Sequence, residues 1–132
     1  MDAFVTSIDV RFRDIDAMGH VNNAVYATYL EQARTDYFRR VLEEDIAKTS
    51  TVIATLSIDY RDPILLEDES ATVEVTVPDV GTSSIPMEYT VRTDRGVAAE
   101  AESVQVLYDT EAETSVPIPD DWRSTIREYH DE

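Results

Sequence analysis

The residues best suited to chemistry lie between Asp14 and Tyr26, in the segment Asp-Ile-Asp-Ala-Met-Gly-His-Val-Asn-Asn-Ala-Val-Tyr. Two carboxylates, one imidazole and two carboxamides occur there within ten residues. The segment directly precedes the longest helical pattern of the chain, so it lies next to the free N–H groups and positive dipole of a helix N-terminus. Such N–H groups can polarise a carbonyl, and a nearby carboxylate can attack an acyl carbon or activate water. The combination favours transfer of an acyl group to water.

The same residues also have purely structural explanations. Asp14 could bond its own turn, and Asp16 could accept a loop amide. His20 could be a packed side chain, and Asn22 and Asn23 could simply cap the helix. Composition and spacing alone leave both interpretations open.

One long helix must position this segment. The pattern extends from about Asn22 to about Ile46, with Asn22 as candidate N-cap. One face is apolar and aromatic, and we expect its tyrosines to belong to the core rather than to an acyl-binding surface. These residues are Tyr26, Tyr29, Leu30, Ala33, Tyr37, Val41 and Leu42. Glu31, a rival general base, is expected to form an ion pair with Arg34.

The rest of the chain is dominated by strand patterns. The expected strands are Val5–Phe12, Thr51–Tyr60, Ser70–Val77, Ser83–Thr93 and Val97–Tyr108. A tight turn at Asp94-Arg95-Gly96 should join the last two, and a short helix should run from Pro119 to Tyr129. This order predicts an α+β fold in which a five-stranded antiparallel sheet wraps around one long central helix. A single helix leaves sheet edges uncovered, so we expect at least a dimer, either a homodimer or a homotetramer.

Composition narrows the functional classes. The chain has 132 residues, which suits a single domain over 1–132. It has no Cys, so disulfides, thiolate nucleophiles and Cys-based metal sites are excluded. No apolar stretch is long enough to span a membrane, and the N-terminus does not look like a signal peptide, so we expect a cytoplasmic protein.

The charge is strongly negative. Asp and Glu number 28 against 11 Lys and Arg, which gives a net charge of −17, and Lys48 is the only lysine. Nucleic-acid binding and attachment to a membrane surface are both disfavoured, because each needs a basic patch. An acid-rich, lysine-poor composition fits solubility in concentrated salt, so we hypothesise a halophilic origin, with an ordinary acidic cytosolic protein as the alternative.

The segment from Asp14 to Arg34 closely resembles the entry to the central helix of hotdog-fold acyl-CoA thioesterases, above all the 4-hydroxybenzoyl-CoA thioesterase-like branch. A weaker likeness continues through Ile58–Pro63 and Val80–Ser84. The resemblance implies a sheet that wraps around one helix and dimerises through the sheets. It also implies an acyl-CoA or acyl-carrier thioester as substrate, hydrolysed without a metal or an organic cofactor.

The resemblance also suggests roles for individual residues. The family's catalytic Asp matches Asp16, which would act as nucleophile or general base, and the backbone amide that polarises the thioester carbonyl matches Asn23. Some bacterial members have a His where this chain has Asn23, so their Asp–His pair is absent here. Plant acyl-carrier-protein thioesterases place a His at the position of His20, but a further Asn of their motif is Met18 in this chain. Asp14 is expected to be structural.

Substrate-binding residues are less constrained. Ser83 and Ser84 are candidates for lining the acyl pocket, although they could equally just begin a strand. Arg61 is a candidate for binding the CoA phosphates, together with Arg92, Arg95, Arg123 and Arg127. Two alternatives to hydrolysis remain on the same fold: an enoyl-thioester hydratase, and a non-catalytic acyl-CoA binding or regulatory protein.

Overall fold

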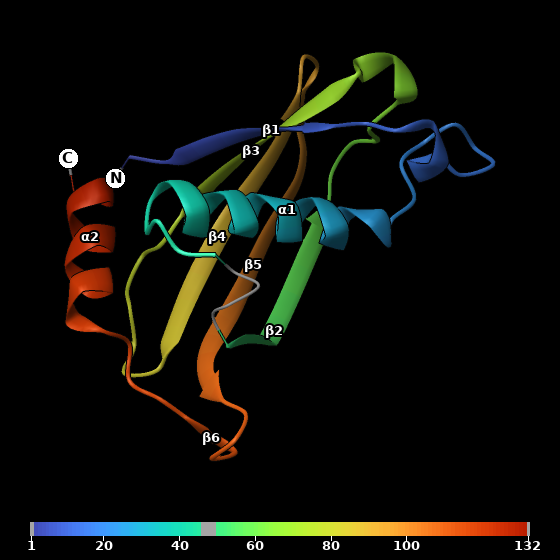
Figure 1. Cartoon of the computed structure of the whole chain (residues 1–132). Coiled ribbons are helices and arrows are strands. Elements are labelled where there is room, and N and C mark those ends of the chain that lie inside the picture. Colours follow the sequence, from blue (N-terminus) through green and yellow to red (C-terminus); the bar gives the residue numbers. More distant parts are fainter. Residues whose placement is uncertain (1, 46–49, 132) are drawn as a thin grey trace.

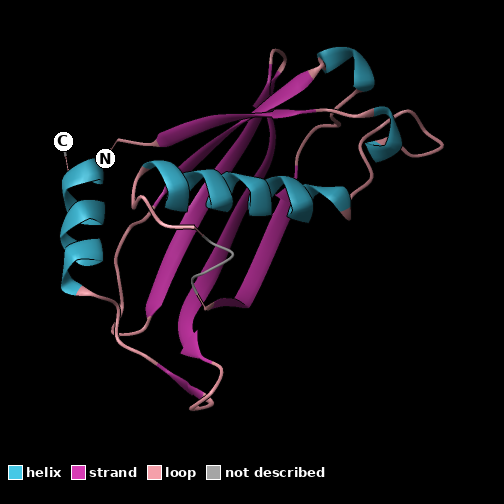
Figure 2. Ribbon diagram, in the orientation of Figure 1, coloured by secondary structure: helices cyan, strands magenta, loops and turns pink. Residues whose placement is uncertain are grey.

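The computed structural model describes residues 2–45 and 50–131, in which one curved antiparallel sheet wraps around a long helix (Figures 1 and 2). The elements are β1 (Phe4–Asp9), α1 (Val25–Arg40), β2 (Thr51–Tyr60), β3 (Ser70–Thr76), β4 (Ser84–Thr93), β5 (Gly96–Asp109), β6 (Thr114–Ser115) and α2 (Asp120–His130). The strand order is β1-β3-β4-β5-β2, and the short β6 pairs with β5. The expected α+β arrangement is confirmed, with β6 as one strand more than the five predicted.

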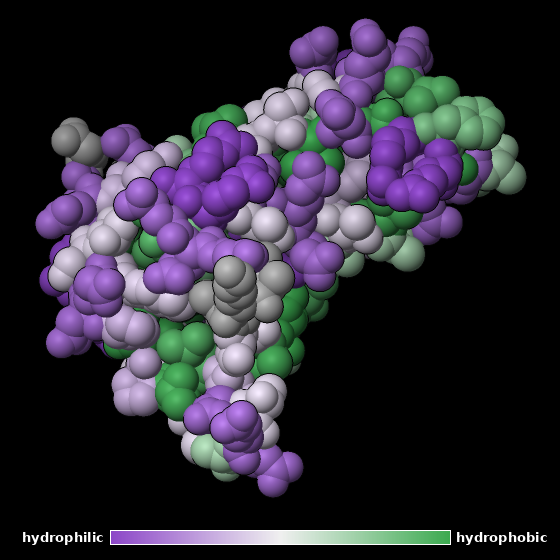
Figure 3. All heavy atoms as spheres, viewed as in Figure 1, coloured by the Kyte–Doolittle hydropathy of each residue, from purple (hydrophilic) through white to green (hydrophobic). Residues whose placement is uncertain are grey.

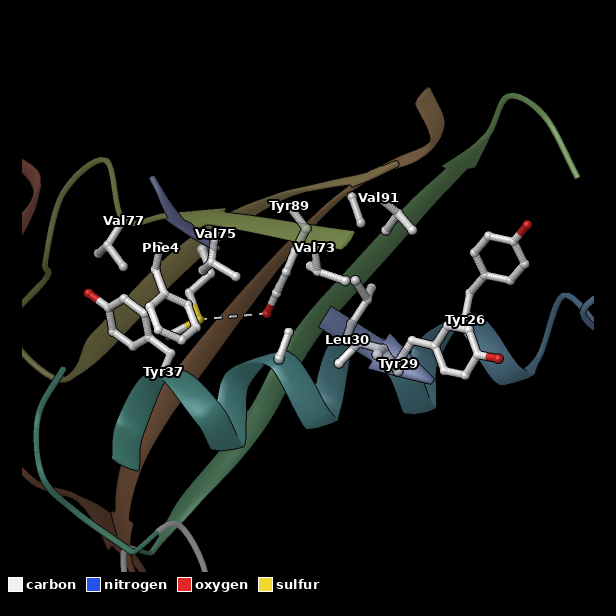
Figure 4. Packing of buried hydrophobic residues seen from close by; sticks show 14 of the residues in the cluster. Phe4, Tyr26, Tyr29, Leu30, Tyr37, Val73, Val75, Val77, Tyr89 and Val91 are labelled. Carbon is white, nitrogen blue, oxygen red and sulfur yellow. Dashed lines mark hydrogen bonds between the residues drawn. The ribbon is translucent and has the colours of Figure 1, made fainter. Parts of the chain in front are cut away.

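The core lies between α1 and the concave face of the sheet (Figure 4). Tyr26, Tyr29 and Tyr37 of α1 are each at most 3% exposed, which confirms that the aromatic face of the helix is core. They pack against alternate residues of the strands, among them Val73 and Val75 of β3. The buried residues that recur every three or four positions on the helix and those that alternate along the strands therefore form one core cluster.

The ends of β1 and α1 differ most from the sequence-based expectation, while the other predicted elements shift by about one residue. β1 ends at Asp9 rather than Phe12, because Phe12–Asp14 forms a short 3-10 turn. α1 begins at Val25, and the Asn22 side chain accepts a hydrogen bond from the Ala24 N–H (2.9 Å) just before it. α1 ends at Arg40, and the predicted end at Ile46 lies outside the described residues.

The second helix, α2, packs beside the C-terminal end of α1 (Figure 2). His130 is buried and links two elements: its Nδ1 lies 2.6 Å from the Asp2 carbonyl and its Nε2 lies 2.9 Å from the Tyr37 hydroxyl. Because a carbonyl can only accept, Nδ1 is the donor, and Nε2 then accepts from Tyr37. Burial raises the pKa of Tyr37, which keeps this hydroxyl a donor. Among the described residues, no helix is long and apolar enough to cross a membrane.

Candidate active site

The chemically promising segment folds into a small hairpin between β1 and α1. The Asp16 N–H donates to the His20 carbonyl and the Asn22 N–H donates to the Asp14 carbonyl, both at 2.8 Å. Gly19 lies at the tip with φ of 81°, a left-handed conformation that favours glycine. The Val21 N–H donates to the carbonyl of Ile64 (2.8 Å), which fastens the hairpin to the segment after β2. The hairpin thus brings Asp16 and His20 to the entrance of α1.

Asp14 is a structural carboxylate, as expected. It is 3% exposed and accepts a hydrogen bond from the Tyr29 hydroxyl (2.7 Å). It accepts three more from Arg11: one from the backbone N–H (3.1 Å) and two from the guanidinium (3.2 and 3.4 Å). Burial by itself would raise the pKa of Asp14, but the bonds from Tyr29 and Arg11 outweigh it and hold the pKa below its usual value. Burial and the same carboxylate raise the pKa of Tyr29. Asp14 therefore anchors the hairpin to α1.

Asp16 is held differently. Its Oδ1 accepts hydrogen bonds from the backbone N–H groups of Met18 (2.9 Å) and His20 (3.2 Å). Its Oδ2 makes no hydrogen bond to any described residue, and the side chain is half-buried. One oxygen fixes the carboxylate and the other stays available, which is the condition a nucleophile or general base needs.

Asn23 stands at the helix entrance with its own N–H unused. The N–H groups of Asn22, Ala24 and Val25 all donate within this segment, whereas the Asn23 N–H has no acceptor in the described part of the chain. The Asn23 carbonyl accepts a hydrogen bond from the Tyr60 hydroxyl at 2.8 Å. Sequence reasoning missed Tyr60, whose only signal was its place at the end of an expected strand. An oriented, free backbone N–H is the usual donor to a developing oxyanion.

His20 lies in the same hairpin and is half-buried. Its backbone forms an isolated bridge with Leu65, and its imidazole has no hydrogen-bond partner among the described residues. The hairpin links His20 to Asp16 through backbone groups rather than through the ring: the His20 N–H donates to the Asp16 Oδ1, and the His20 carbonyl accepts from the Asp16 N–H.

Ser83 and Ser84 are not brought to this hairpin within one chain. Ser84 begins β4 opposite Val106, which pairs with Val52 at the start of β2, while Tyr60 at the other end of β2 contacts Asn23. Eight residues of extended strand separate Val52 from Tyr60, or about 26 Å. The two serines could therefore reach this site only from a second copy.

Arg61 directly follows Tyr60, so it lies at the end of β2 that is next to Asn23. It is exposed, and its Nη2 forms an ion pair with Glu100 at 2.9 Å. An exposed ion pair is worth only about 0–1 kcal/mol, so a phosphate could replace Glu100 as its partner. Arg61 remains a candidate for substrate binding.

The other arginines expected to bind phosphate are mostly engaged already. Arg92 pairs with Glu74 (3.2 Å), and Arg95 pairs with Asp68. Arg123 donates to the carbonyls of Val80 and Gly81, both at 3.1 Å. Arg127 instead lines a pocket beside α2, together with Arg123 and His130.

The expected ion pair between Glu31 and Arg34 is absent from the structure. No carboxylate of a described residue lies within 4 Å of the Arg34 guanidinium, which donates instead to the Tyr89 hydroxyl (3.2 Å) inside the core. The spacing rule for helix surfaces fails here because Arg34 is on the buried face. Across residues 2–45 and 50–131, no group of three or more His, Asp or Glu is arranged to hold a metal ion.

Comparison with solved structures supports the interpretation of the fold. A thioesterase of Thermus thermophilus, solved in complex with coenzyme A and Zn, superposes with a TM-score of 0.86 at 36% identity. The superposition covers 97% of this chain and 94% of that one. The fold is therefore the hotdog fold of thioesterases, as the resemblance implied.

Comparison of sequences leads to the same group. YsmA of Bacillus subtilis, a protein without an assigned function, is 31% identical over 88 residues, or 66% of this chain. The long-chain acyl-CoA thioesterase FadM of Escherichia coli is 38% identical over 69 residues, or 48% of this chain. The matched segments span only 59% and 50% of these two relatives' own lengths. The model of the thioesterase-like superfamily matches residues 10–126, nearly the whole chain, and the chain belongs to that superfamily.

Proposed function

We propose that this chain hydrolyses the thioester of an acyl-CoA or an acyl carrier to a free acid and a thiol. The observation that carries the proposal is the pairing of two uncommitted groups at one helix entrance. These are the Oδ2 of Asp16, whose other oxygen is held by two N–H groups, and the unused N–H of Asn23. The family and the likeness to FadM support the substrate class.

In this mechanism the thioester carbonyl accepts a hydrogen bond from the Asn23 N–H. Asp16 either attacks the carbonyl carbon, forming an anhydride that water then cleaves, or takes a proton from an attacking water. In both routes the C–S bond breaks, the acyl carbon keeps the OH of the attacking water, and the leaving thiolate takes up the proton that this water releases. His20, in the same hairpin, is proposed to assist proton transfer, and Arg61 to bind a CoA phosphate. The reaction as written uses no metal or organic cofactor.

We further propose that the working unit is a homodimer or homotetramer that pairs β2 with β2 of a second copy. β2 is the last strand of the sheet, and within the described part of the chain one of its backbone edges has no paired strand. Hydrophobic side chains lie exposed along this edge (Figure 3). Val52, Ile53 and Leu56 are 38–47% exposed, which is unusual for apolar residues of a central sheet. A second copy would cover the parts of these side chains that face away from α1, and its Ser83 and Ser84 would approach the site.

The test is release of free thiol from short, long and aryl acyl-CoAs by wild type and Asp16→Asn. About 2 M KCl shortens the Debye length to a few Å and screens the repulsion between CoA and this acidic chain. Asp16→Asn should lower kcat by about 10²- to 10⁴-fold. A folded Asp16→Asn protein that releases thiol at the wild-type rate would refute the assignment.

Asp109→Asn is the matched control. The Asp109 Oδ1 also accepts hydrogen bonds from two backbone N–H groups, those of Glu111 (2.9 Å) and Ala112 (3.2 Å). Asp109 is the last residue of β5, far along the chain from Asp16. Loss of activity in both variants would point to loop disruption rather than catalysis. Hydration of an enoyl-CoA without thiol release would support the hydratase alternative, and ligand binding that survives Asp16→Asn without any turnover would support the binding role.

A further inference from the structure

Arg34 is a buried cation without a buried anion. It is 4% exposed, and the Tyr89 hydroxyl, 3.2 Å from its Nη1, is its one hydrogen-bond partner in the part of the chain that the structure describes. All six ion pairs among the described residues involve other arginines. Every buried side-chain nitrogen or oxygen of the described residues has a hydrogen-bond partner, so the remaining guanidinium nitrogens of Arg34 reach open space. A largely buried cation is stabilised by a counter-charge, and this open side is where an anionic partner can bind.

The hydrogen bonds around Arg34 supply no negative charge. The Ser103 hydroxyl donates to the Gln105 Oε1 (2.5 Å), and the Gln105 Nε2 donates to the Ile85 carbonyl (2.8 Å). Because Ser103 already donates its proton to Gln105, the Tyr89 hydroxyl must be the donor in its 2.5 Å contact with Ser103. The Tyr89 hydroxyl also lies 3.7 Å from the sulfur of Met87 (Figure 4). The hydrogen bonds therefore form one chain in which each group donates to the next, from Arg34 to the Ile85 carbonyl. Every group in this chain except Arg34 is neutral. Four of the five N–H donors of Arg34 have no acceptor among residues 2–45 and 50–131.

These donors border a cavity. A space of about 670 Å³, open to solvent, is lined by Arg34, Thr35 and Gln105 on one side and by Thr51, Val52 and Ile53 of β2 on the other. Glu31 is also at its rim but forms no ion pair with Arg34. The cavity offers one cationic fork, a few hydroxyl and amide groups, and apolar walls.

The cavity lies on the same helix face as the proposed catalytic groups. Arg34 is eleven residues after Asn23, which is about three helical turns, or about 16 Å, along α1. β2 runs beside the helix between these points: Tyr60 contacts Asn23 and Tyr26 at one end, and Val52 and Ile53 line the Arg34 cavity at the other. The Asn23 end, where the thioester is proposed to react, and Arg34 therefore lie at opposite ends of the same surface between α1 and β2.

We propose that Arg34 binds a carboxylate at the far end of the acyl chain, so that the preferred substrates are ω-carboxyacyl thioesters of medium length. This inference rests on the proposed function. The planar guanidinium fork matches a carboxylate in a bidentate geometry, and Val52 and Ile53 contact the methylenes. A zigzag acyl chain advances about 1.25 Å per C–C bond, and a long side chain on a helix leans several Å toward the helix N-terminus, so the backbone span of about 16 Å from Asn23 to Arg34 leaves room for roughly 8–12 carbons.

The test compares chains that differ only at the ω-end. Values of kcat/KM are measured for suberyl-CoA against octanoyl-CoA and for sebacyl-CoA against decanoyl-CoA, with thermal melts to verify folding. Wild type should favour the carboxylated member by roughly 10- to 100-fold, the range of charge-assisted hydrogen bonds. Arg34→Met should bring the ratio close to one, and Arg34→Lys should leave an intermediate ratio. Tyr89→Phe, which removes the contact that positions Arg34, should lower the ratio partly.

Arg39→Met is the matched control, because Arg39 lies on the same helix but is exposed and pairs with Asp36. Its ratio should equal that of wild type. A wild type that prefers the methyl-ended chains, or an Arg34→Met ratio equal to wild type, would overturn the inference. If Arg34→Met changes the oligomeric mass while the ratio stays constant, the carboxylate comes from a second copy, and the inference is likewise wrong.

The two hypotheses fail separately. Hydrolysis of octanoyl-CoA without any ω-carboxylate preference would overturn the inference and keep the proposed function. If no thioester is cleaved, calorimetric titration of monomethyl suberate and dimethyl suberate decides: tighter binding of the monoester, which keeps one free carboxylate, that disappears in Arg34→Met supports the carboxylate site alone. Equal binding of both esters would refute it.

Discussion

Tyr60→Phe tests whether orientation of the Asn23 backbone contributes to catalysis. The change removes the hydroxyl that donates to the Asn23 carbonyl at 2.8 Å, while the ring contact with Tyr26, 4.9 Å between centroids, is retained. A neutral hydrogen bond contributes about 0.5–1.5 kcal/mol, and because Tyr60 is 46% exposed, water can partly replace it. We therefore expect loss of the Tyr60 hydrogen bond to raise the activation free energy by about 0.5–1 kcal/mol, which corresponds to a decrease in kcat of about two- to fivefold.

The assay is steady-state thiol release from the best acyl-CoA, with kcat, KM and melting temperature determined for each protein. Tyr108→Phe is the control, since it also removes one tyrosine hydroxyl, on β5, that has no hydrogen-bond partner among the described residues. The expected result is a lower kcat for Tyr60→Phe at nearly constant KM, with Tyr108→Phe equal to wild type. An unchanged kcat, or a change confined to KM, would show that the Asn23 amide does not depend on Tyr60.

Two further predictions concern stability and assembly. The pKa of Asp14 is lowered in the folded state, so its contribution is present at neutral pH and is lost as the pH falls through that lowered pKa. Asp14→Asn should therefore destabilise by about 1.5–3 kcal/mol at pH 7 in urea unfolding, and the difference should shrink below about pH 4; a pH-independent difference would contradict this. Leu56→Lys on β2 should reduce the oligomeric mass in light scattering, whereas Val5→Lys on β1, at the opposite edge of the sheet, should not. An unchanged mass for Leu56→Lys would exclude β2 as the interface.

Much of the fold could be predicted because burial leaves a periodic record in the sequence. β3 alternates buried Ala71, Val73 and Val75 with less buried neighbours, so its pattern specified both strand and face. The two-residue turn before Gly96 could be predicted equally well from its residue types, and Gly96 has a φ of 126°. Element ends were less predictable: β1 stops early because the Asp14 carboxylate draws the chain into a turn, a contact that depends on Tyr29 fifteen residues away.

The candidate site could be predicted only where its residues are close in sequence. Asp16, His20 and Asn23 lie in one hairpin at one helix entrance, so their motif indicated their neighbourhood. Strand register was not readable, and it decides that Ser84 lies at the far end of the sheet. The inward direction of Arg34 was hidden for a similar reason, since its partner Tyr89 is 55 residues away.

The reciprocal contacts between Asp2 and His130 bear on the order of folding. The Asp2 N–H donates to the His130 carbonyl, and the His130 Nδ1 donates back to the Asp2 carbonyl, which joins residues 128 positions apart. Closing a loop of that length is entropically costly until intervening contacts have shortened it. The contact should therefore form late in folding, after α1 has packed on the sheet. It should also open early, so hydrogen exchange is expected to be fastest where α2 meets the start of β1.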